Sequence, residues 1–297
     1  MVQPQVDLGC HGSGTCASVR EGALVVALAG QPNVGKSTIF NMLTGLSQHV
    51  GNWPGKTVER KTGPYVHQGR EMALVDLPGT YSLTANSVEE RIARDYIIHE
   101  APDVVVAVVD AAIPERSLYL LAELLLLPAP VVMVLNMMDV AEQEGVQIEP
   151  RVLEAALGIP VIGMVATRNE GLAPMLDAIV AVADGTYPYN PKRPTILPDH
   201  EAVLGTLITL IAPYVPSPYP VPWVALKLLE GDEELIDMMR AAAPSDVWEQ
   251  VHAILYKHED AVLDIAGARY TWIARMVRAA VVRPRVGELL LNTTGLV

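Results

Sequence analysis

The fold of this chain is decided by the stretch Gly30-Gln31-Pro32-Asn33-Val34-Gly35-Lys36-Ser37. It has the spacing of a phosphate-binding P-loop, in which a glycine is followed after four residues by Gly-Lys-Ser. The apolar segment 23–29 before it predicts a strand, and segment 38–43 after it predicts a helix. Because a P-loop connects a strand to a helix in this way, the sequence predicts a nucleotide site here.

Several groups of this loop have an expected role. The backbone N–H groups and the positive end of the following helix would bind phosphate oxygens. Lys36 would reach the β- and γ-phosphates, and the Ser37 hydroxyl would bind Mg²⁺. We expect the nucleotide to contact the whole loop and also Thr38, the residue that follows it.

The composition limits the class of protein. A chain of 297 residues is long enough for about two domains. Although 51% of the residues are hydrophobic, no uninterrupted apolar run approaches the roughly 20 residues that a membrane-spanning helix needs. The net charge of −13 argues against nucleic acid as a partner, because the phosphate backbone would repel the chain.

Residues 1–22 are predicted to form a flexible leader. Cys10, His11 and Cys16 lie in it, and two thiolates and an imidazole can bind one soft metal ion. A fourth ligand is missing, so we favour a leader without metal. Because both cysteines lie in the leader, no disulfide framework holds the fold, and a reducing cytosol is compatible with the chain.

Two segments after the P-loop helix are candidates for sensing the γ-phosphate. The first, residues 46–57, contains too many glycine and proline residues for a regular element and ends at Gly55-Lys56-Thr57. In a GTPase such a loop brings one threonine hydroxyl to Mg²⁺ and releases it after hydrolysis, which makes Thr57 the candidate. The alternative is an ordinary surface loop that ends in a threonine of high β-propensity.

The second segment is Asp76-Leu77-Pro78-Gly79, which follows a predicted hairpin over residues 65–76 with its turn near 68–69. Asp76 would hold Mg²⁺, usually through water, and the Gly79 N–H would contact the γ-phosphate. The next residue is Thr80, at the position where many signalling GTPases have a catalytic glutamine. No side-chain amide is therefore present there to orient the attacking water.

Helices and buried strands alternate over residues 87–183, which predicts a doubly wound α/β sheet with its ligands at the carboxyl ends of the strands. Two of those ends carry candidate base-binding groups. In Asn136-Met137-Met138-Asp139, the aspartate would accept hydrogen bonds from the guanine N1–H and 2-amino group. Ala166 and Thr167 follow the next strand, and we expect the Ala166 N–H to donate to the guanine O6.

Residues 186–199 are rich in proline and predict a linker. We therefore place a GTPase domain at 23–185, a small all-α domain at 200–285 and a tail at 286–297. Four helices are predicted after the linker, at residues 200–214, 223–230, 233–242 and 245–282, the last with Ser245 as its N-cap.

Longer runs are similar to the cytosolic N-terminal part of the FeoB ferrous-iron transporter family, over about residues 24–285. They are the P-loop with its Asn33, Val50-Gly51-Asn52-Trp53-Pro54-Gly55-Lys56-Thr57-Val58-Glu59, Asp76-Leu77-Pro78-Gly79-Thr80-Tyr81-Ser82-Leu83, Leu135-Asn136-Met137-Met138-Asp139, Trp223-Val224-Ala225-Leu226-Lys227-Leu228-Leu229-Glu230-Gly231-Asp232 and Ala268-Arg269-Tyr270. Two residues depart from the usual GTPase pattern. Most GTPases have a lysine at Met137, although methionine is usual in this family, and Lys56 replaces what is often a small apolar residue.

The resemblance implies slow hydrolysis of GTP to GDP and phosphate with Mg²⁺, coupled to Fe²⁺ uptake at the cytoplasmic face of the bacterial inner membrane. It implies that the helical domain modulates guanine-nucleotide release, in the manner of a GDP-dissociation inhibitor. The partners that it implies are a C-terminal transmembrane iron-permeation domain of the same polypeptide, further copies in a homo-oligomer and small accessory Feo proteins.

Resemblance to cation-dependent GTPases also implies a role for K⁺. The Asn33 side-chain oxygen would complete a shell of switch-loop carbonyls around K⁺ beside the phosphates, where developing charge needs stabilisation. Asn33 would then act in catalysis together with Lys36, Thr57 and Gly79. The alternative is an asparagine that only stabilises the turn.

Two other functions remain open on the sequence. A soluble ribosome-assembly or tRNA-modification GTPase usually carries a basic RNA-binding domain, whereas the segment 200–285 is acidic to neutral. A switch module that binds GTP without hydrolysing it would be distinguished by single-turnover hydrolysis.

The Asn-x-x-Asp motif generates a first prediction. Asp139→Asn should weaken GTP binding on the order of 100-fold, because the pair of charge-assisted hydrogen bonds to guanine is lost. The variant should favour xanthosine triphosphate, since an amide can donate to its 2-oxo group. Competition titrations with both nucleotides measure this, and unchanged GTP affinity with xanthosine triphosphate still excluded would contradict the assignment.

Overall fold

The computed structural model describes residues 22–84 and 87–282. The predicted leader with Cys10, His11 and Cys16, and the predicted tail 286–297, lie outside the described residues, apart from Gly22. The elements are, in order, β1 (Leu24–Gly30), α1 (Lys36–Thr44), β2 (His49–Asn52), β3 (Glu59–His67), β4 (Arg70–Asp76), α2 (Val88–His99), β5 (Val104–Asp110), α3 (Pro114–Leu124), β6 (Val131–Asn136), α4 (Met138–Gln143), β7 (Gln147–Ile148), α5 (Pro150–Leu157), β8 (Val161–Gly163), the 3₁₀ turn η1 (Ala166–Arg168), α6 (Leu172–Ala183), α7 (Pro198–Ile211), α8 (Val221–Leu229), α9 (Glu233–Ala242), α10 (Ser245–Lys257), α11 (Ala261–Ala280) and β9 (Val281–Val282).

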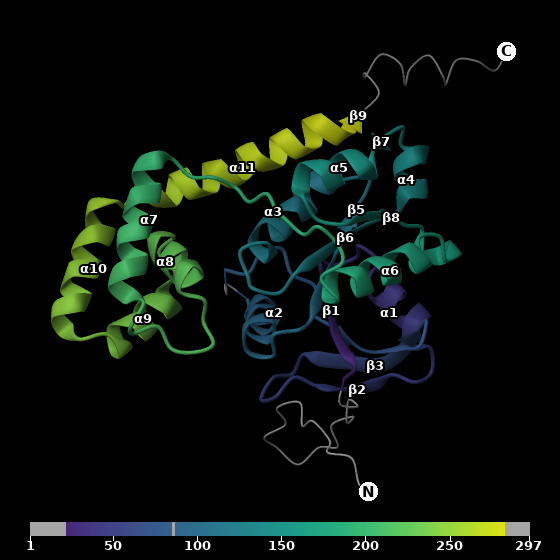
Figure 1. The fold of residues 1–297 in the computed structure, drawn as a ribbon, viewed down its shortest axis with the longest axis horizontal. Coiled ribbons are helices and arrows are strands. Elements are labelled where there is room, and N and C mark those ends of the chain that lie inside the picture. Colours follow the sequence, from purple (N-terminus) through teal and green to yellow (C-terminus); the bar gives the residue numbers. More distant parts are fainter. Residues whose placement is uncertain (1–21, 85–86, 283–297) are drawn as a thin grey trace, which may run out of the picture.

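Seven strands form one mixed sheet in the order β2-β3-β4-β1-β5-β6-β8 (Figure 1). The strands β4, β1, β5, β6 and β8 are parallel, so their carboxyl ends meet at one edge. β2 and β3 are antiparallel and extend the sheet on the β4 side. The predicted class, a doubly wound α/β sheet followed by an all-α domain, is confirmed.

The pattern of β5 explains the layers. Its even-numbered valines join the core under α1 and α6, and its odd-numbered residues join the core under α2, α3 and α5. A central parallel strand is covered on both faces, and for that reason it reads as an unbroken apolar run rather than an alternating one. The polar residue Asp110 appears only where the strand reaches the edge of the sheet.

The helices α7 to α11 form a second lobe beside the sheet, and α11 runs from that lobe back over α3 and α5 (Figure 1). The core under α2, α3 and α5 continues without interruption into this lobe. β9, directly after α11, pairs with β7, and the Trp272 indole N–H donates to the Lys192 carbonyl at 2.9 Å. The two lobes therefore share one apolar core and one long helix.

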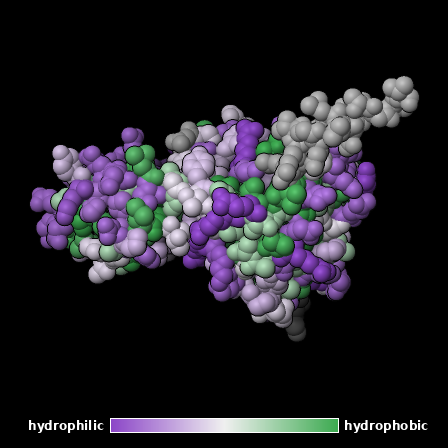
Figure 2. Space-filling view, turned by 90° about the horizontal axis from the view of Figure 1, so that it is seen from above, coloured by the Kyte–Doolittle hydropathy of each residue, from purple (hydrophilic) through white to green (hydrophobic). Residues whose placement is uncertain are grey.

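Surface chemistry differs between the lobes. Seen from above, hydrophilic residues dominate the outer end of the helical lobe, and a hydrophobic patch lies on the larger lobe (Figure 2). Within residues 22–84 and 87–282, none of the helices combines the length and the hydrophobicity that crossing a bilayer requires.

Three local predictions are wrong. His49–Asn52 forms the edge strand β2, although its segment was expected to contain no regular element. The single helix predicted over 245–282 is divided at residues 258–260 into α10 and α11. Ser245 is the first residue of α10 rather than its cap, because Pro244 holds the cap position without a side-chain hydrogen bond.

Three buried charges and the partly buried Glu230 join the lobes. Lys227 of α8 binds Glu123 of α3 at 3.2 Å and Glu230 at 2.7 Å. The guanidinium of Arg269, on α11, contacts Glu230 and lies 3.7 Å from Glu123. Burial lowers the pKa of Lys227, but Glu123 and Glu230 outweigh it and raise that pKa overall. The network therefore pairs two carboxylates with two cations.

Glu123 also reaches the segment after Asp76-Leu77-Pro78-Gly79. Its Oε2 accepts a hydrogen bond from the Leu83 N–H at 2.6 Å, while its Oε1 binds Lys227. Only 1% of the Glu123 side chain is exposed. A buried carboxylate without partners costs about 3–5 kcal/mol of free energy. Glu123 therefore keeps its contacts with the Leu83 N–H and Lys227 in one arrangement.

We predict that Glu123→Gln lowers the free energy of unfolding by about 3–5 kcal/mol, because it leaves two buried cations with one carboxylate. The matched control is Asp237→Asn, which removes the exposed pair of Asp237 with Arg240 and should cost less than about 1 kcal/mol. Urea unfolding of both variants measures the difference. Equal shifts of the two midpoints would show that the buried network contributes no more than a surface pair.

Candidate nucleotide site

The P-loop connects β1 to α1 at the carboxyl edge of the sheet. Asn33 has φ 66° and Gly35 has φ 89°, so the chain takes two left-handed steps before the helix begins. A Cβ atom on Gly35 would lie 2.1 Å from Asn136 Nδ2, which leaves glycine as the residue that fits. Gly30 ends β1, Val34 is buried, and Pro32, Asn33, Ser37 and Thr38 are exposed around the loop.

The loop is tied down at its start by Gln31. This side chain is 5% exposed, and its Nε2 donates to the Arg116 carbonyl of α3 at 2.5 Å. The Arg116 guanidinium lies 4.6 Å above the ring of Tyr81. The motif gave no sign of these contacts, because its variable positions carry no fixed role.

Lys36, Ser37 and Asp76 meet at the end of β4. Lys36 Nζ lies 3.0 Å from Asp76 Oδ1, and Ser37 Oγ donates to Asp76 Oδ2 at 3.1 Å. Lys36 and Asp76 are each 8% exposed. Oxygen ligands are those that Mg²⁺ prefers, and neighbouring ligands in its octahedral shell lie about 2.9 Å apart. The hydroxyl and the carboxylate are thus close to the spacing of two oxygens in a magnesium shell.

The segment after Asp76 lies against the P-loop. The Leu77 N–H donates to the Leu28 carbonyl at 3.0 Å, and the Thr80 N–H donates to the Gly30 carbonyl at 3.1 Å. Leu77 is buried and Pro78 is half-buried. A Cβ on Gly79 would lie 3.0 Å from the Pro32 nitrogen, so this glycine allows the two segments to approach.

Thr57 is not brought to this group. It lies, exposed, with Gly55 and Lys56 in the loop between β2 and β3, and within the described chain its side chain makes no hydrogen bond to Ser37 or Asp76. The loop is closed by hydrogen bonds from the Trp53 N–H to the Val58 carbonyl and from the Lys56 N–H to the Trp53 carbonyl, both 2.9 Å long.

Trp53 anchors the same loop. The side chain is 6% exposed, meets Tyr96 of α2 edge to face with ring centroids 5.4 Å apart, and lies under the Arg60 guanidinium at 5.0 Å. None of the sequence motifs predicted this anchor. A tryptophan in a segment of glycine and proline was the available signal, since a large aromatic residue is seldom left in solvent.

Asn136 joins the P-loop to the segment after β8. Its Nδ2 donates to the Val34 carbonyl at 2.9 Å, and its Oδ1 accepts from the Ala166 N–H at 3.1 Å. The residue is 3% exposed. Because the Ala166 N–H is used in this way, it does not point to a bound base as we expected. The Thr167 N–H, one residue later, has no hydrogen-bond acceptor among the described residues.

Asp139 is the second residue of α4, directly after Met138, next to this bridge. Its Oδ1 accepts from the Val140 N–H at 3.0 Å, and Arg168 lies 3.6 Å from its Oδ2. The side chain is 22% exposed, so it can accept further hydrogen bonds. Met137, the residue before α4, has φ 63°. This left-handed conformation turns the chain from β6 into α4.

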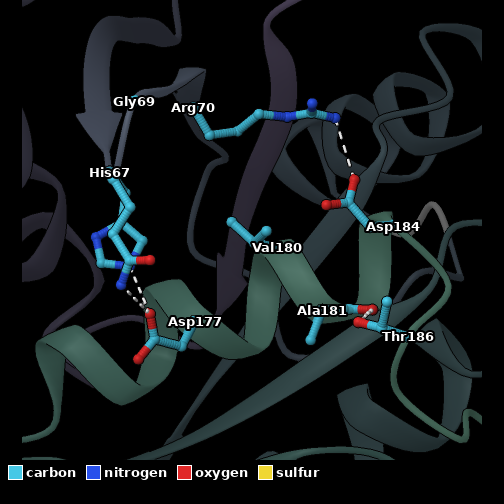
Figure 3. Close-up of a pocket in the computed structure, with 9 residues that line it drawn as sticks. His67, Gly69, Arg70, Asp177, Val180, Ala181, Asp184 and Thr186 are labelled. Atoms are coloured by element: carbon cyan, nitrogen blue, oxygen red, sulfur yellow. Dashed lines mark hydrogen bonds and ion pairs between the residues drawn. The ribbon is translucent and has the colours of Figure 1, made fainter.

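A separate hollow lies between the β3–β4 turn and α6 (Figure 3). His67 Nε2 contacts Asp177 Oδ1 at 2.6 Å, and Arg70 pairs with Asp184 at 3.2 Å. Arg70 begins β4 and Asp76 ends it, so this hollow lies at the opposite edge of the sheet. These side chains bind one another, and we assign the hollow no ligand.

Two protein-family models match the chain. The model described as Ferrous iron transport protein B matches residues 24–179, and the model described as FeoB cytosolic helical domain matches residues 198–282. The Fe(2+) transporter FeoB of Escherichia coli (strain K12) is 40% identical over 259 residues, which cover 84% of this chain and 32% of that protein. The chain thus spans about a third of the length of the curated relatives that it matches.

Solved structures agree with these matches. A GDP-bound mutant of S. thermophilus NFeoB is 31% identical with a TM-score of 0.79, and the match covers 87% of this chain and all of that one. The cytosolic domain of the T. maritima FeoB iron transporter in a GDP form is 32% identical with a TM-score of 0.75, over 88% of this chain and 98% of that one.

The bridge at Asn136 generates a prediction. Asn136→Ala should lower guanine-nucleotide affinity at least tenfold and cost about 2–4 kcal/mol of stability, because a buried N–H and a buried carbonyl lose their partner. Asn136→Asp keeps the acceptor for Ala166 but sets an oxygen against the Val34 carbonyl, so it should fail as well. Asn190→Ala, an exposed asparagine, serves as the control.

Fluorescent-nucleotide titration and thermal melting measure these variants. Wild-type affinity in Asn136→Asp would show that the bond to the Val34 carbonyl is dispensable.

Proposed function

Because the chain belongs to the ferrous iron transport protein B family, we propose that it is the GTP-binding and GTP-hydrolysing part of an iron(II) transporter. The observation that carries the proposal is the meeting of Lys36, Ser37 and Asp76 beside a P-loop that Asn136 joins to the segment after β8. The ammonium group of Lys36 suits a phosphate ligand, and the oxygens of Ser37 and Asp76 suit Mg²⁺ beside it. The amide of Asn136 fixes the segment after β8, where we expect the base to bind.

At the phosphate end, Ser37 and Asp76 would hold Mg²⁺, which offsets the charge on the β- and γ-phosphate oxygens when bound. Lys36 pairs with Asp76 in this structure, and once Asp76 has another cation as its partner the ammonium group is free to bind phosphate. Gly79 lies against Pro32 of the P-loop, and its N–H would bind the γ-phosphate.

At the base end, Asp139 would accept from the guanine N1–H and 2-amino group, which adenine cannot offer. Because the Ala166 N–H is bonded to Asn136, we propose the Thr167 N–H as the donor to the guanine O6. Arg168 lies near Asp139 in an exposed position, where the pair contributes little energy and can open for a base.

For hydrolysis, the chain must activate water without a glutamine at Thr80. Asn33 is exposed at the mouth of the loop and would hold K⁺ with its side-chain oxygen. Thr57 would close on Ser37 and Asp76 when GTP is bound, and its present exposure is compatible with an open loop. Hydrolysis by the chain alone is slow on this proposal.

The rest of the transporter follows from the family. We infer that a membrane domain continues the polypeptide and carries Fe²⁺, that the chain lies at the cytoplasmic face of the inner membrane, and that other copies and small accessory Feo proteins are partners. The region matched by the helical model, 198–282, would then modulate nucleotide release.

We predict that GTP turnover is at least tenfold faster in KCl than in NaCl, and that removing the Asn33 side chain abolishes the difference while GDP affinity changes little. Two variants are needed because the backbone at Asn33 is left-handed. Asn33→Gly keeps that backbone without strain, whereas Asn33→Ala adds about 1–2 kcal/mol of strain. Turnover at constant ionic strength measures the effect.

Equal wild-type rates in the two salts would refute the role of K⁺. If Asn33→Gly still turned over GTP faster in KCl than in NaCl, a group other than the Asn33 side chain would bind K⁺.

A further inference from the structure

A second group of metal-binding side chains lies in the helical lobe. His200 is in the first turn of α7, and His258 and Asp260 form the corner between α10 and α11. One nitrogen or oxygen from each of these three residues lies within 4.8 Å of the other two. α7 and α10 belong to the lobe beside the sheet, so the group is remote from the P-loop (Figure 1).

The environment of His200 fixes which nitrogen is available. Its Nδ1 lies 2.9 Å from Asp264 Oδ2, and the same oxygen accepts from the Leu197 N–H at 2.9 Å. The imidazole is thus held on the Nδ1 side by a carboxylate that is itself held. Metal-binding histidines have this arrangement, in which a carboxylate orients the ring and leaves the other nitrogen for the metal.

The other nitrogen, Nε2, points to the corner. It lies 3.5 Å from Asp260 Oδ1, and the rings of His200 and His258 meet nearly at right angles with centroids 5.9 Å apart. Two ligands bound tetrahedrally at about 2.1 Å lie about 3.4 Å from each other. The distance between Nε2 and Oδ1 already has this value, and a rotation of the half-buried His258 would complete the group.

We propose that His200, His258 and Asp260 bind one divalent transition-metal ion, with Asp264 as the positioning residue of His200. Two imidazoles and one carboxylate suit Fe²⁺, Co²⁺ and Zn²⁺ and are a poor match for Mg²⁺, which prefers oxygen ligands. The ion would connect the start of α7 to the end of α10 and the first turn of α11.

A metal-free explanation competes with this one. A protonated His200 between Asp260 and Asp264 forms two ion pairs by itself, and His258 then has no part. The two explanations differ over His258, which makes no side-chain hydrogen bond or ion pair among the described residues. Its substitution therefore removes a metal ligand and leaves both ion pairs of His200 in place.

The test is a Co²⁺ titration of the full chain, followed by the visible absorption of the ion and by calorimetry. Cys10→Ser and Cys16→Ser are introduced first, because the leader is a rival metal site, and excess GDP with Mg²⁺ occupies the nucleotide site. One Co²⁺ per chain should bind, Zn²⁺ should displace it, and anaerobic Fe²⁺ should compete for it. The thermal melting temperature should rise with bound metal.

Four variants decide the assignment. His258→Gln and Asp260→Asn should each weaken Co²⁺ binding at least tenfold, and Asp264→Asn should weaken it about 10- to 100-fold by releasing the His200 ring. His252→Gln, an exposed histidine on the same helix, should bind as the wild type does. Unchanged nucleotide affinity of each variant shows that the chain is folded.

Absence of stoichiometric Co²⁺ binding, or equal affinity in wild type and His258→Gln, would overturn the proposal. Loss of binding in His252→Gln would overturn it as well, because the site would then lie elsewhere on α10.

Discussion

The amide of Asn136 holds the candidate nucleotide site together. Its Nδ2 donates to the carbonyl of Val34, and its Oδ1 accepts from the N–H of Ala166. The P-loop and the segment after β8 are more than 130 residues apart in sequence, yet this one side chain sets the distance between them. Because a Cβ at Gly35 would collide with that amide, the bridge requires the glycine of the motif. Asparagine is required because a carboxylate has no N–H to donate and a leucine has neither group.

A second buried group connects this site to the helical lobe. Glu123 holds the Leu83 N–H with one oxygen and the cations of Lys227 and Arg269 with the other. Leu83 follows Gly79 by four residues, so the segment that lies against the P-loop and the helices α8 and α11 share one carboxylate. A movement of that segment changes the position of a buried charge, and the helices that carry the opposite charges must follow or lose their partners.

The sequence was most informative where one local rule decides the structure. β5 could be predicted because burial on both faces requires an apolar run, and the P-loop because its spacing has one known geometry. The edge strand β2 could not, since it is stabilised by pairing with β3 rather than by its own residues. The break between α10 and α11 contains no proline or glycine, so the sequence predicts a continuous helix through His258. The hydrogen bond that occupies the Ala166 N–H comes from a residue 30 positions away, which no local pattern records.

The helix α11 has a mechanical consequence. Its 20 residues give it a length of about 30 Å. One end is held to the larger lobe by the pairing of β9 with β7 and by the contacts with α3 and α5, while the other end reaches the corner at His258. A tilt of about 5° about the end at β9 would move the opposite end of a 30 Å helix by about 2.6 Å, and Asp264 at that end is bonded to His200 of α7. A small rotation of α11 where it packs on α3 and α5 would therefore displace α7 and the corner at His258 together.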